Sequence, residues 1–434
     1  MSESVNMQSV AFRSIGCRTN QEELAVLKCQ FMELGYKIVD ECAEADVVIL
    51  NTCAVTALTE VKTRKIIKTI RAQAPGAKIL VTGCMAQNKP GQFENFAGVN
   101  WVVGNTLKNK IPSIVQNSPD GVYHCNFDEI REKSDSVQMP AKKIYFGGKT
   151  RFPVKIQEGC DFGCAYCIVP SVRGPSRSYD IDQVLDACSE AIDVGYKEIV
   201  LTGTHIGQFR HGLVNLINKI LMKKGDFRIR LSSLDPRDLN RELLDLLGDE
   251  RVCKHLHLSL QSLSEPVLEG MNRPYSSVSK LLELLNEFRA KYPHAGFGAD
   301  LIVGFPGETD EMFETTLKRA DELRLSYAHV FRFSPRAGTR AVELPNQIDE
   351  KTKLVRSAVL REVIEKNRAL FIKNMHNIKD RIIVESENPC RGLTSNYLHV
   401  EIPGHCEPKN SWLEVTVLPQ TRGRFVEARV VSEL

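Results

Sequence analysis

Three cysteines stand close together near the middle of the chain, at Cys160, Cys164 and Cys167. They follow directly on a strand-like apolar run, residues 153–156. Three thiolates hold three irons of a 4Fe-4S cluster and leave the fourth iron without a protein ligand. The spacing therefore predicts a cluster with one open iron. Such an iron is a reaction site, which a purely structural cluster does not have.

A zinc site and a disulfide are the simpler explanations of these thiols. Zinc would require a fourth Cys or His close by, and beyond the three thiols residues 161–177 contain neither. A disulfide would require an oxidising compartment. The N-terminus lacks the basic and apolar regions of a signal peptide, and no run of about 18 apolar residues could cross a membrane. We therefore expect a cytoplasmic chain without membrane contact, whose 13 cysteines serve metal or redox chemistry.

Short apolar runs alternate with helical patterns through the first third of the chain. Strands are predicted at residues 10–15, 46–50, 77–82 and 101–103, and helices at residues 20–34 and 58–73. This alternation predicts an α/β fold with a doubly wound parallel sheet and helices on both of its faces. The Pro-, Gly- and charge-rich segment that follows is predicted to be a linker.

Three more cysteines, Cys17, Cys53 and Cys84, each follow one of these predicted strands. The carboxyl ends of parallel strands open into one crevice, so we expect the three thiols to meet there. Each alone is more often an ordinary loop or core cysteine, but together they predict a second cluster with three protein ligands. The remaining seven cysteines show no ligand spacing and are interpreted as buried or surface thiols.

Strand and helix patterns alternate again after Cys167. Six strands at residues 154–157, 198–202, 228–232, 255–260, 298–303 and 329–333 predict a partial (β/α)6 barrel, whose active groups belong at the carboxyl ends of the strands. The residues at those ends that we expect to bind a cofactor are Thr202, Gly203, Ser232, Ser259, Gln261, Gly304, Phe305 and Pro306. Ordinary turn chemistry is the alternative for each of them. Arg173 and Arg177, just past the cysteines, could meet an acidic substrate, a cofactor carboxylate or only solvent.

Basic residues that could bind nucleic acid lie in two places, although the net charge of +3 neither demands nor excludes such a partner. The predicted helix at residues 58–73 carries Lys62, Arg64, Lys65 and Lys68, which form either a phosphate-binding face or a solvated one. From residue 372 onward, short β-rich segments predict a small barrel of a kind that often binds oligonucleotides. This tail has no net charge, so the candidate patch is local: Arg422 and Arg424, with Tyr397 or Phe425 for stacking.

Along nearly its whole length the sequence resembles the radical SAM methylthiotransferases, enzymes that use S-adenosylmethionine (SAM). Cys160, Cys164 and Cys167 match the ligands of their SAM-binding cluster, and Cys17, Cys53 and Cys84 match those of their auxiliary cluster. The resemblance implies two 4Fe-4S clusters and SAM as cofactors. It also implies a methylthiotransferase N-terminal domain at residues 8–118, a linker at 119–145, a radical SAM core at 146–371 and a TRAM domain at 372–434.

Three segments, residues 16–22, 231–236 and 331–339, resemble most the branch that acts on N6-threonylcarbamoyladenosine at position 37 of tRNA. Two segments depart from common patterns. Arg18-Thr19 stands where Lys-Val is more usual, and Thr202-Gly203-Thr204 stands where many radical SAM enzymes have Gly-Gly-Glu.

The resemblance implies a radical reaction, because C2 of adenine is an unactivated C–H carbon. One SAM would methylate a sulfur carried at the open iron of the auxiliary cluster, and a second would be cleaved to the radical that activates C2. The implied partners are the tRNA anticodon loop, whose unpaired bases can be splayed out, and an electron donor of the flavodoxin or ferredoxin type. The sequence does not identify the sulfur source.

Two other functions share these cysteines. One is a methylthiotransferase that acts on an aspartate of a ribosomal protein, against which residues 232–236 favour tRNA. The other is a non-catalytic iron-sulfur protein that binds RNA or carries a cluster. An open iron argues against that second possibility, since a purely structural cluster would be expected to use four ligands.

Overall fold

The computed structural model describes residues 8–16, 18–54, 57–94, 96, 98–127, 136–137, 150–273 and 277–431. The chain divides into two compact units. The first comprises Met1–Gly147, Glu158–Phe162 and Cys167–Tyr179, and the second comprises Gly148–Gln157, Gly163–Tyr166 and Asp180–Leu434. Across the described part of the chain, no helix combines the length and the apolar character that a membrane span requires.

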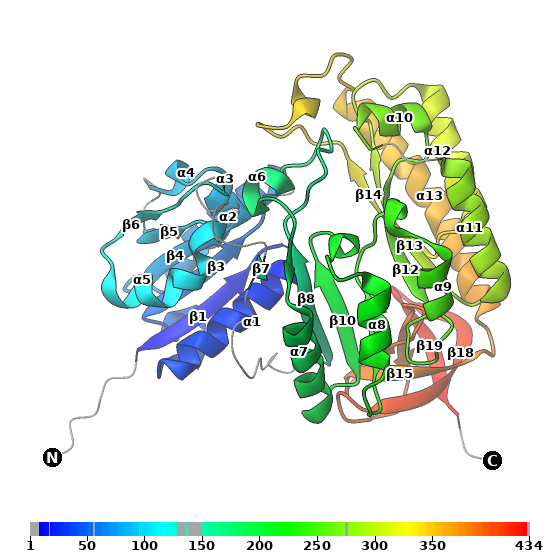
Figure 1. Cartoon of the computed structure of the whole chain (residues 1–434), viewed down its shortest axis with the longest axis horizontal. Coiled ribbons are helices and arrows are strands. Elements are labelled where there is room, and N and C mark those ends of the chain that lie inside the picture. Colours follow the sequence, from blue (N-terminus) through cyan, green and yellow to red (C-terminus); the bar gives the residue numbers. More distant parts are fainter. Residues whose placement is uncertain are drawn as a thin grey trace. The chain divides into compact units, whose positions relative to one another are not determined.

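The first unit is built on a parallel sheet of six strands (blue to cyan in Figure 1). Their order is β2 (Lys37–Val39), β1 (Ser9–Ser14), β3 (Val47–Thr52), β4 (Lys78–Gly83), β5 (Trp101–Val103) and β6 (Gly121–Tyr123). Every neighbouring pair in this order runs parallel. Because β1 leads outward to β2 and then the chain returns to β3 on the other side, the direction of winding reverses between β1 and β3.

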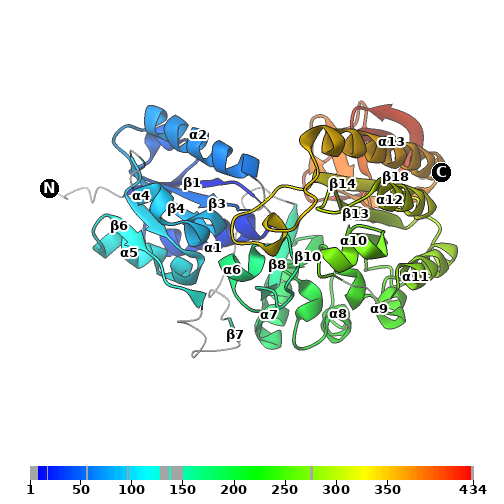
Figure 2. The same ribbon diagram turned by 90° about the horizontal axis from the view of Figure 1, so that it is seen from above.

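Helices cover both faces of this sheet, and Figure 2 shows α1 and α2 on opposite sides of the strands. One face packs against α1 (Arg18–Glu33) and α5 (Ile111–Asn117), and the other against α2 (Ala57–Gln73), α3 (Cys84–Asn88) and α4 (Gly91–Glu94). Alternate strand residues supply the two cores: Val10 and Ile49 face α1, whereas Ala11 and Val48 face α2. The predicted doubly wound sheet is confirmed.

Two strands of this sheet were not predicted. Both β2 and β6 have only three residues and pair with a single neighbour, so they are too short to show an alternating pattern. Strand β6 lies inside the segment that was predicted to be a linker, where it pairs with β5. Most of the remaining predicted linker lies outside the described residues, apart from β7 (Ser136–Val137), which pairs with β9 (Arg177–Tyr179).

The second unit contains the six predicted parallel strands in two groups of three. These are β8 (Arg151–Glu158), β10 (Glu198–Gly203) and β11 (Arg228–Leu231), followed by β12 (His255–Gln261), β13 (Gly296–Val303) and β14 (Tyr327–Arg332). A parallel bridge between Leu234 and Leu258 continues from one group to the next. The partial (β/α)6 barrel is therefore confirmed.

The barrel helices are α7 (Ile181–Asp193), α8 (Leu213–Leu221), α9 (Arg241–Leu246), α10 (Glu265–Gly270), α11 (Val278–Lys291), α12 (Asp310–Glu322) and α13 (Glu350–Asn374) (green to orange in Figure 1). Local sequence sets where several of them begin. The side chains of Asp180, Ser277 and Thr309 accept hydrogen bonds from backbone N–H groups in the first turns of α7, α11 and α12.

The end of the chain forms a closed five-stranded β-barrel (orange to red in Figure 1). Its strands are β15 (Lys379–Ser386), β16 (Cys390–Leu393), β17 (His399–Ile402), β19 (Phe425–Val430) and β18 (Trp412–Arg422), in spatial order. It is consistent with the predicted TRAM fold. Strand β16 was not predicted, because its sequence Cys-Arg-Gly-Leu lacks the β-branched residues that mark a strand.

Two buried arginines of β11 join this small barrel to the partial barrel. Arg228 donates to the carbonyl oxygens of Arg381 and Leu393, and Arg230 donates to those of Thr394 and Ser395. Both arginines also pair with the fully buried Glu198, and their charges hold the pKa of that carboxyl well below its usual range against the effect of burial. Removing one partner of such a buried pair costs about 3–5 kcal/mol. The small barrel thus closes the amino-terminal end of the partial barrel and leaves the carboxyl ends of its strands to other groups.

Candidate functional site

The first candidate site lies at the point of the first sheet where the winding reverses. In sheets of this type, ligands bind outside the carboxyl ends of the strands at that point. Gly16 and Cys53 follow β1 and β3, and Cys84 begins α3 directly after β4. Cys17 lies outside the described residues. The structure thus places the segments that carry all three cysteines at neighbouring strand ends.

Two glycines show how closely these segments approach each other. A Cβ atom on Gly16 would lie 2.7 Å from Cβ of Cys53 and 3.3 Å from its Sγ, so the backbone next to Cys17 touches the Cys53 side chain. Gly83 has a φ of +99°, and a Cβ atom there would lie 2.3 Å from the carbonyl oxygen of Thr52. Glycine at both positions therefore lets the Cys53 segment contact its neighbours on either side.

Buried amides fix the same strand ends. The Asn20 Nδ2 atom donates to the carbonyl oxygens of Ile15, at 3.1 Å, and Thr52, at 2.9 Å. Asn51 Nδ2 donates to the carbonyl oxygen of Asn20 at 3.0 Å and to Glu23 Oε2 at 3.2 Å. On the other side, Asn105 Nδ2 lies 3.6 Å from Cys84 Sγ. These amides were missed in the sequence, where an isolated Asn carries no sign of its tertiary partner.

Arg173 belongs to the same hydrogen-bond network as Asn20 and Glu23. It therefore meets neither an acidic substrate, nor a cofactor carboxylate, nor solvent alone, which were the partners considered for it. Its side chain is only 4% exposed, and it donates to Glu23 Oε1 at 2.7 Å, Asn20 Oδ1 at 2.9 Å and Glu158 Oε1 at 3.0 Å. Lys108 contacts the other oxygen of Glu23. Since the carboxylates of its own unit already hold this guanidinium, Arg173 is a structural cation that ties α1 to the segment after Cys167.

The flanks of the loop that carries Cys160 and Cys167 are held inside the first unit. Gly159 has a φ of +78°, and a Cβ atom there would lie 1.9 Å from the carbonyl oxygen of Pro175, so only glycine fits. The Cys160 N–H donates to the Gly174 carbonyl at 3.1 Å. The Val169 N–H, at the start of α6 (Val169–Arg173), points at Cys167 Sγ from 3.4 Å. A donor aimed at sulfur favours the thiolate that a metal ligand must be.

The central part of the loop, Gly163–Tyr166, is held by the second unit. The Ala165 N–H donates to the Met271 carbonyl, and the Ala165 carbonyl accepts from the Ala341 N–H, both at 2.8 Å. The side chain of Ala165 packs in an apolar cluster that includes Phe305 and Phe333. The loop segment next to Cys164 is therefore fixed by backbone bonds on both sides.

A buried arginine adjoins Cys164. Arg273 Nη1 lies 3.7 Å from the Cys164 sulfur, and its guanidinium forms a 2.7 Å ion pair with Asp235, a residue that is also buried. Arg237 and Arg273 together lower the pKa of Asp235, although burial acts in the opposite direction. A guanidinium at this distance stabilises a thiolate. No sequence spacing connects Arg273 with Cys164, so sequence reasoning missed this contact.

Hydroxyl and amide groups gather at the carboxyl ends of the barrel strands, as predicted. Thr202 is buried, and Gly203 lies so close to the Gln157 carbonyl that a Cβ atom would be 2.8 Å from it. The Oγ1 atom of Thr204 and the Oγ atom of Ser232 are shielded from solvent and have no hydrogen-bond partner among the residues that the structure describes. Hydroxyl groups in this position suit a polar ligand such as the ribose, amino or carboxylate groups of SAM.

The predicted positions on β12 and β13 have more varied environments. The carbonyl oxygen of Ser259 accepts from Arg273, and Gln261 has a φ of 64° where β12 makes a register shift against β13. The Gly304 N–H donates to Glu308 Oε2 at 2.6 Å. Pro306 is buried, and the ring of Phe305 packs in the apolar cluster around Ala165. Protein contacts thus account for Phe305, and its contact with a cofactor stays a prediction.

The basic residues of α2 do not share one environment. Lys62, Lys65 and Lys68 are exposed, whereas Arg64 pairs with Glu60 at 3.5 Å and lies over the Phe96 ring. The three lysines recur every third residue, so they form one stripe along the helix. This stripe is the part of α2 that suits a phosphate backbone.

In the small barrel, the proposed patch is partly neutralised. Arg422 pairs with Glu427 and lies 3.9 Å from Glu401, whereas Arg424 is exposed and lies over the Phe425 ring. Tyr397 was considered as a base-stacking residue, but its ring stacks on that of His255 with centroids 4.4 Å apart. That interpretation of Tyr397 is wrong, because the ring is used in joining the two barrels.

The thiols themselves fit iron-sulfur clusters. Cys53, Cys84, Cys160, Cys164 and Cys167 are all free of disulfide bonds. The sulfur atoms of Cys84, Cys164 and Cys167 each lie beside a hydrogen-bond donor or a cation. A disulfide explanation of Cys160, Cys164 and Cys167 gains no support, since all three thiols are free.

Two protein families match separate parts of the chain. The family described as the radical SAM superfamily matches residues 154–320, and the uncharacterized protein family UPF0004 matches residues 9–104. A threonylcarbamoyladenosine tRNA methylthiotransferase, MtaB of Aquifex aeolicus, is 34% identical over 412 residues, which cover 92% of this chain and 97% of that protein. The protein of the same name in Bacillus subtilis is also 34% identical, and the matched region covers 98% of this chain and 98% of that protein.

A second kind of relative is somewhat less similar. The tRNA-2-methylthio-N(6)-dimethylallyladenosine synthase of Fusobacterium nucleatum is 31% identical over 434 residues, covering 95% of this chain and 97% of that protein. Among solved structures, the radical S-adenosylmethionine methyltransferase TsrM of Kitasatospora setae superposes with a TM-score of 0.60 at 14% identity, and 77% of each chain is covered. At this identity the structural match bears on the fold alone.

Proposed function

Because the chain belongs to the radical SAM methylthiotransferases, we propose that it converts N6-threonylcarbamoyladenosine at position 37 of tRNA to its 2-methylthio derivative. The observation that carries the proposal is that Gly16, Cys53 and Cys84 lie at neighbouring strand ends, where the first sheet reverses. The names of the Aquifex and Bacillus relatives support the threonylcarbamoyl substrate.

Membership of this family implies a 4Fe-4S cluster and SAM. We assign the SAM-binding cluster to Cys160, Cys164 and Cys167, and an auxiliary 4Fe-4S cluster to Cys17, Cys53 and Cys84. When bound, these groups would supply an organic radical and a methylated sulfur, the chemistry needed to replace an unactivated C2–H bond by a C–S bond.

The chain's own residues prepare the site for that chemistry. Arg273 Nη1 lies 3.7 Å from the Cys164 sulfur, and the backbone bonds of Ala165 hold the centre of the loop within the second unit. The hydroxyl groups of Thr204 and Ser232 are available to orient the polar groups of SAM at the barrel rim. In the first unit, Asn20 and Asn51 fix the strand ends so that the auxiliary ligands stay close together.

The proposed substrate is an unpaired base of the anticodon loop, which can be splayed out and read by stacking and edge contacts. We propose that the α2 lysine stripe, Lys62, Lys65 and Lys68, binds phosphates of the same tRNA. Since the proposed substrate is a tRNA, the enzyme would act in the cytoplasm. Its electrons would come from a flavodoxin or a ferredoxin. Arg422 and Arg424 stay as predicted RNA contacts of the small barrel.

Replacing all three stripe lysines by alanine is expected to weaken tRNA binding and its dependence on salt. Each phosphate contact contributes about 0.7–0.9 to the slope of log affinity against log salt concentration, so the slope should fall by about 2–3. Affinity measured at several salt concentrations, for example by fluorescence anisotropy, tests this expectation.

A matched control replaces three exposed lysines of the second unit, Lys280, Lys318 and Lys366, by alanine. This variant loses the same net charge and should keep most of the affinity and the slope. Equal slopes in the two triple variants would show that net charge alone, and not the stripe on α2, attracts the tRNA.

The substrate is tested directly by mass spectrometry of tRNA nucleosides from cells that lack the gene. We expect the 2-methylthio form of N6-threonylcarbamoyladenosine to disappear and the unmodified nucleoside to accumulate. Loss of a methylthiolated dimethylallyladenosine instead would support the second substrate, which the Fusobacterium relative brings into consideration. Unchanged tRNA together with a lost methylthio group on a ribosomal-protein aspartate would overturn the tRNA proposal.

A further inference from the structure

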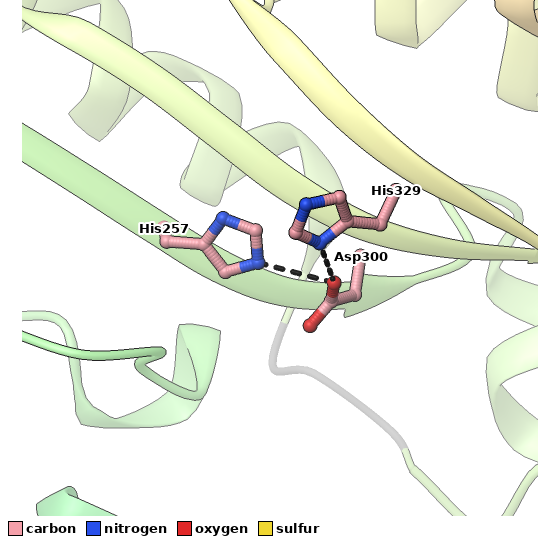
Figure 3. A group of neighbouring side chains, drawn as sticks. All are labelled: His257, Asp300 and His329. Atoms are coloured by element: carbon pink, nitrogen blue, oxygen red, sulfur yellow. Dashed lines mark hydrogen bonds and ion pairs between the residues drawn. The ribbon is translucent and has the colours of Figure 1, made fainter. Parts of the chain in front are cut away.

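Two histidines and an aspartate form a compact group on three neighbouring strands of the partial barrel. Figure 3 shows His257, Asp300 and His329, which come from the neighbouring strands β12, β13 and β14. The His257 Nε2 atom lies 3.1 Å from Asp300 Oδ1, and the His329 Nδ1 atom lies 3.0 Å from the same oxygen. One ligand atom from each residue lies within 4.8 Å of the others. No spacing in the sequence connects these three residues, and none was singled out there.

Strand pairing explains why the three side chains meet. Asp300 stands directly opposite His329 in the parallel pairing of β13 with β14, and His257 stands opposite Gly298, two residues before Asp300. Side chains two apart on a strand project from the same face. At Gly298 a Cβ atom would lie 2.2 Å from the Tyr327 ring, so glycine makes room for that ring beside the group.

The other nitrogen of His257 is also held in place. Its Nδ1 atom lies 2.9 Å from the Tyr327 hydroxyl, which in turn lies 2.8 Å from His255 Nε2. Histidines that bind metals characteristically have their second ring nitrogen fixed by an oxygen in this way, which sets the orientation of the ring. His257 thus presents Nε2 to Asp300 in a fixed direction.

The charge balance distinguishes Asp300, whose side chain is 22% exposed, from the buried carboxylates of this unit. Glu198, Asp235 and Glu308 each form an ion pair with at least one arginine. The ion pairs that the structure gives for Asp300 join it only to His257 and His329. An aspartate side chain that is partly exposed and accepts two hydrogen bonds is ionised at neutral pH. Among the described residues, the group is therefore an anion flanked by two nitrogen donors, with no ion pair to an arginine or lysine.

We propose that His257, Asp300 and His329 bind one divalent first-row transition metal ion, such as Fe²⁺ or Zn²⁺. Two imidazoles and one carboxylate are the ligand set of sites that leave further coordination positions open. The site has an access route, since the side chain of His257 is 9% exposed and that of His329 is 59% exposed. Its ligand His257 lies on the same face of β12 as Ser259. His257 comes two residues earlier on the strand and is therefore about 7 Å further from the barrel rim.

Hydrogen bonding alone offers a second account of the same distances. Neutral His257 and His329 could each donate a proton to the ionised Asp300, and the Tyr327 hydroxyl could donate to His257 Nδ1. In that case the group would hold protons and would show no affinity for metal. The two accounts differ in a measurable way, because only the metal site predicts uptake of a divalent ion by these residues.

Titration of Co²⁺ into the cluster-loaded protein under anaerobic conditions tests the proposal. Oxidised 4Fe-4S clusters have no net spin, so the paramagnetic resonance signal of high-spin Co²⁺ can be followed without interference. We expect one equivalent to bind and pulsed spectra to show coupling to imidazole nitrogen. Neither SAM nor tRNA is present, so the result bears on this site separately from methylthiolation.

Variants define which residues are the ligands. Asp300→Asn and His329→Ala each remove a ligand and are expected to weaken Co²⁺ binding by at least about 100-fold. Tyr327→Phe removes the partner of a ligand, His257, and is expected to weaken binding by about 10-fold or more. His405→Ala, which breaks a His–Glu pair elsewhere in the unit, should bind like the unchanged protein. Circular dichroism establishes that each variant is folded.

Three results would overturn the proposal. The first is no Co²⁺ uptake by the unchanged protein at micromolar metal, which would leave the hydrogen-bonded group as the correct account. The second is equal uptake by the unchanged protein and by His329→Ala. The third is a bound equivalent whose spectra show no coupling to nitrogen.

Discussion

Cys164→Ala is expected to abolish the cleavage of SAM, measured as release of 5'-deoxyadenosine by the anaerobically reconstituted protein. The loss should be about three orders of magnitude or more, because a site with two of its three thiolates does not keep the cluster that supplies the electron. The iron content should fall by about one cluster for each chain, since the auxiliary site is unaffected. Cys164 is half-buried in a loop, so the fold should survive its replacement.

Cys406→Ala is the matched control for this variant. Cys406 is an exposed thiol of the second unit, and it has no ligand spacing. Its replacement should leave both the iron content and the release of 5'-deoxyadenosine unchanged. If Cys164→Ala still released 5'-deoxyadenosine at the rate of this control, the assignment of the SAM-binding cluster to the Cys160 loop would be wrong.

Cys53→Ala is expected to separate the two halves of the reaction. Cleavage of SAM should remain within about twofold of the unchanged protein, because the ligands of the SAM-binding cluster are intact. Formation of the methylthio product should fall below detection, since the auxiliary cluster is the proposed site of the sulfur. Mass spectrometry of tRNA nucleosides and of 5'-deoxyadenosine from the same reaction measures both quantities.

Cys42→Ala provides the comparison for this second variant. Cys42 is a buried cysteine of the same unit, and burial raises the pKa of its thiol, so it stays protonated and does not suit an iron ligand. Its replacement should remove packing but leave the methylthio product. Product formation by Cys53→Ala would contradict the auxiliary cluster, whereas loss of product in both variants would point to a general effect on the first sheet.

The fold could be predicted from the sequence wherever apolar periodicity is strong. The strands of the partial barrel appeared at nearly their observed positions. Their apolar residues either run together, as in β10, or alternate with polar ones, as in β12, and clear helical patterns lie between them. The short strands β2, β6 and β16 could not be predicted, since segments of three or four residues carry too little pattern. Tertiary pairing, not local preference, makes those segments strands.

The candidate site, like the fold, could be predicted from the sequence only in part. Cysteine spacing indicates a cluster because the three ligands of the Cys160 loop are close in sequence, and the strand-end positions of Cys53 and Cys84 follow from the order of the elements. Arg273 could not be connected with Cys164, since 109 residues separate them and only the folded chain brings them to 3.7 Å. Arg173 appeared to be available to a ligand, but the fold buries it among carboxylates.

What the sequence determined by itself is therefore the chemistry that is encoded locally: which thiols form a set, which strands they follow, and which family shares both features. The tertiary structure alone decided which charged and polar groups surround that chemistry. Arg273 beside Cys164, the Asn20 and Asn51 amides beneath the strand ends, and the His257, Asp300 and His329 group all depend on contacts between distant segments. Periodicity and spacing report on neighbours along the chain, whereas electrostatics and hydrogen bonding depend on neighbours in space.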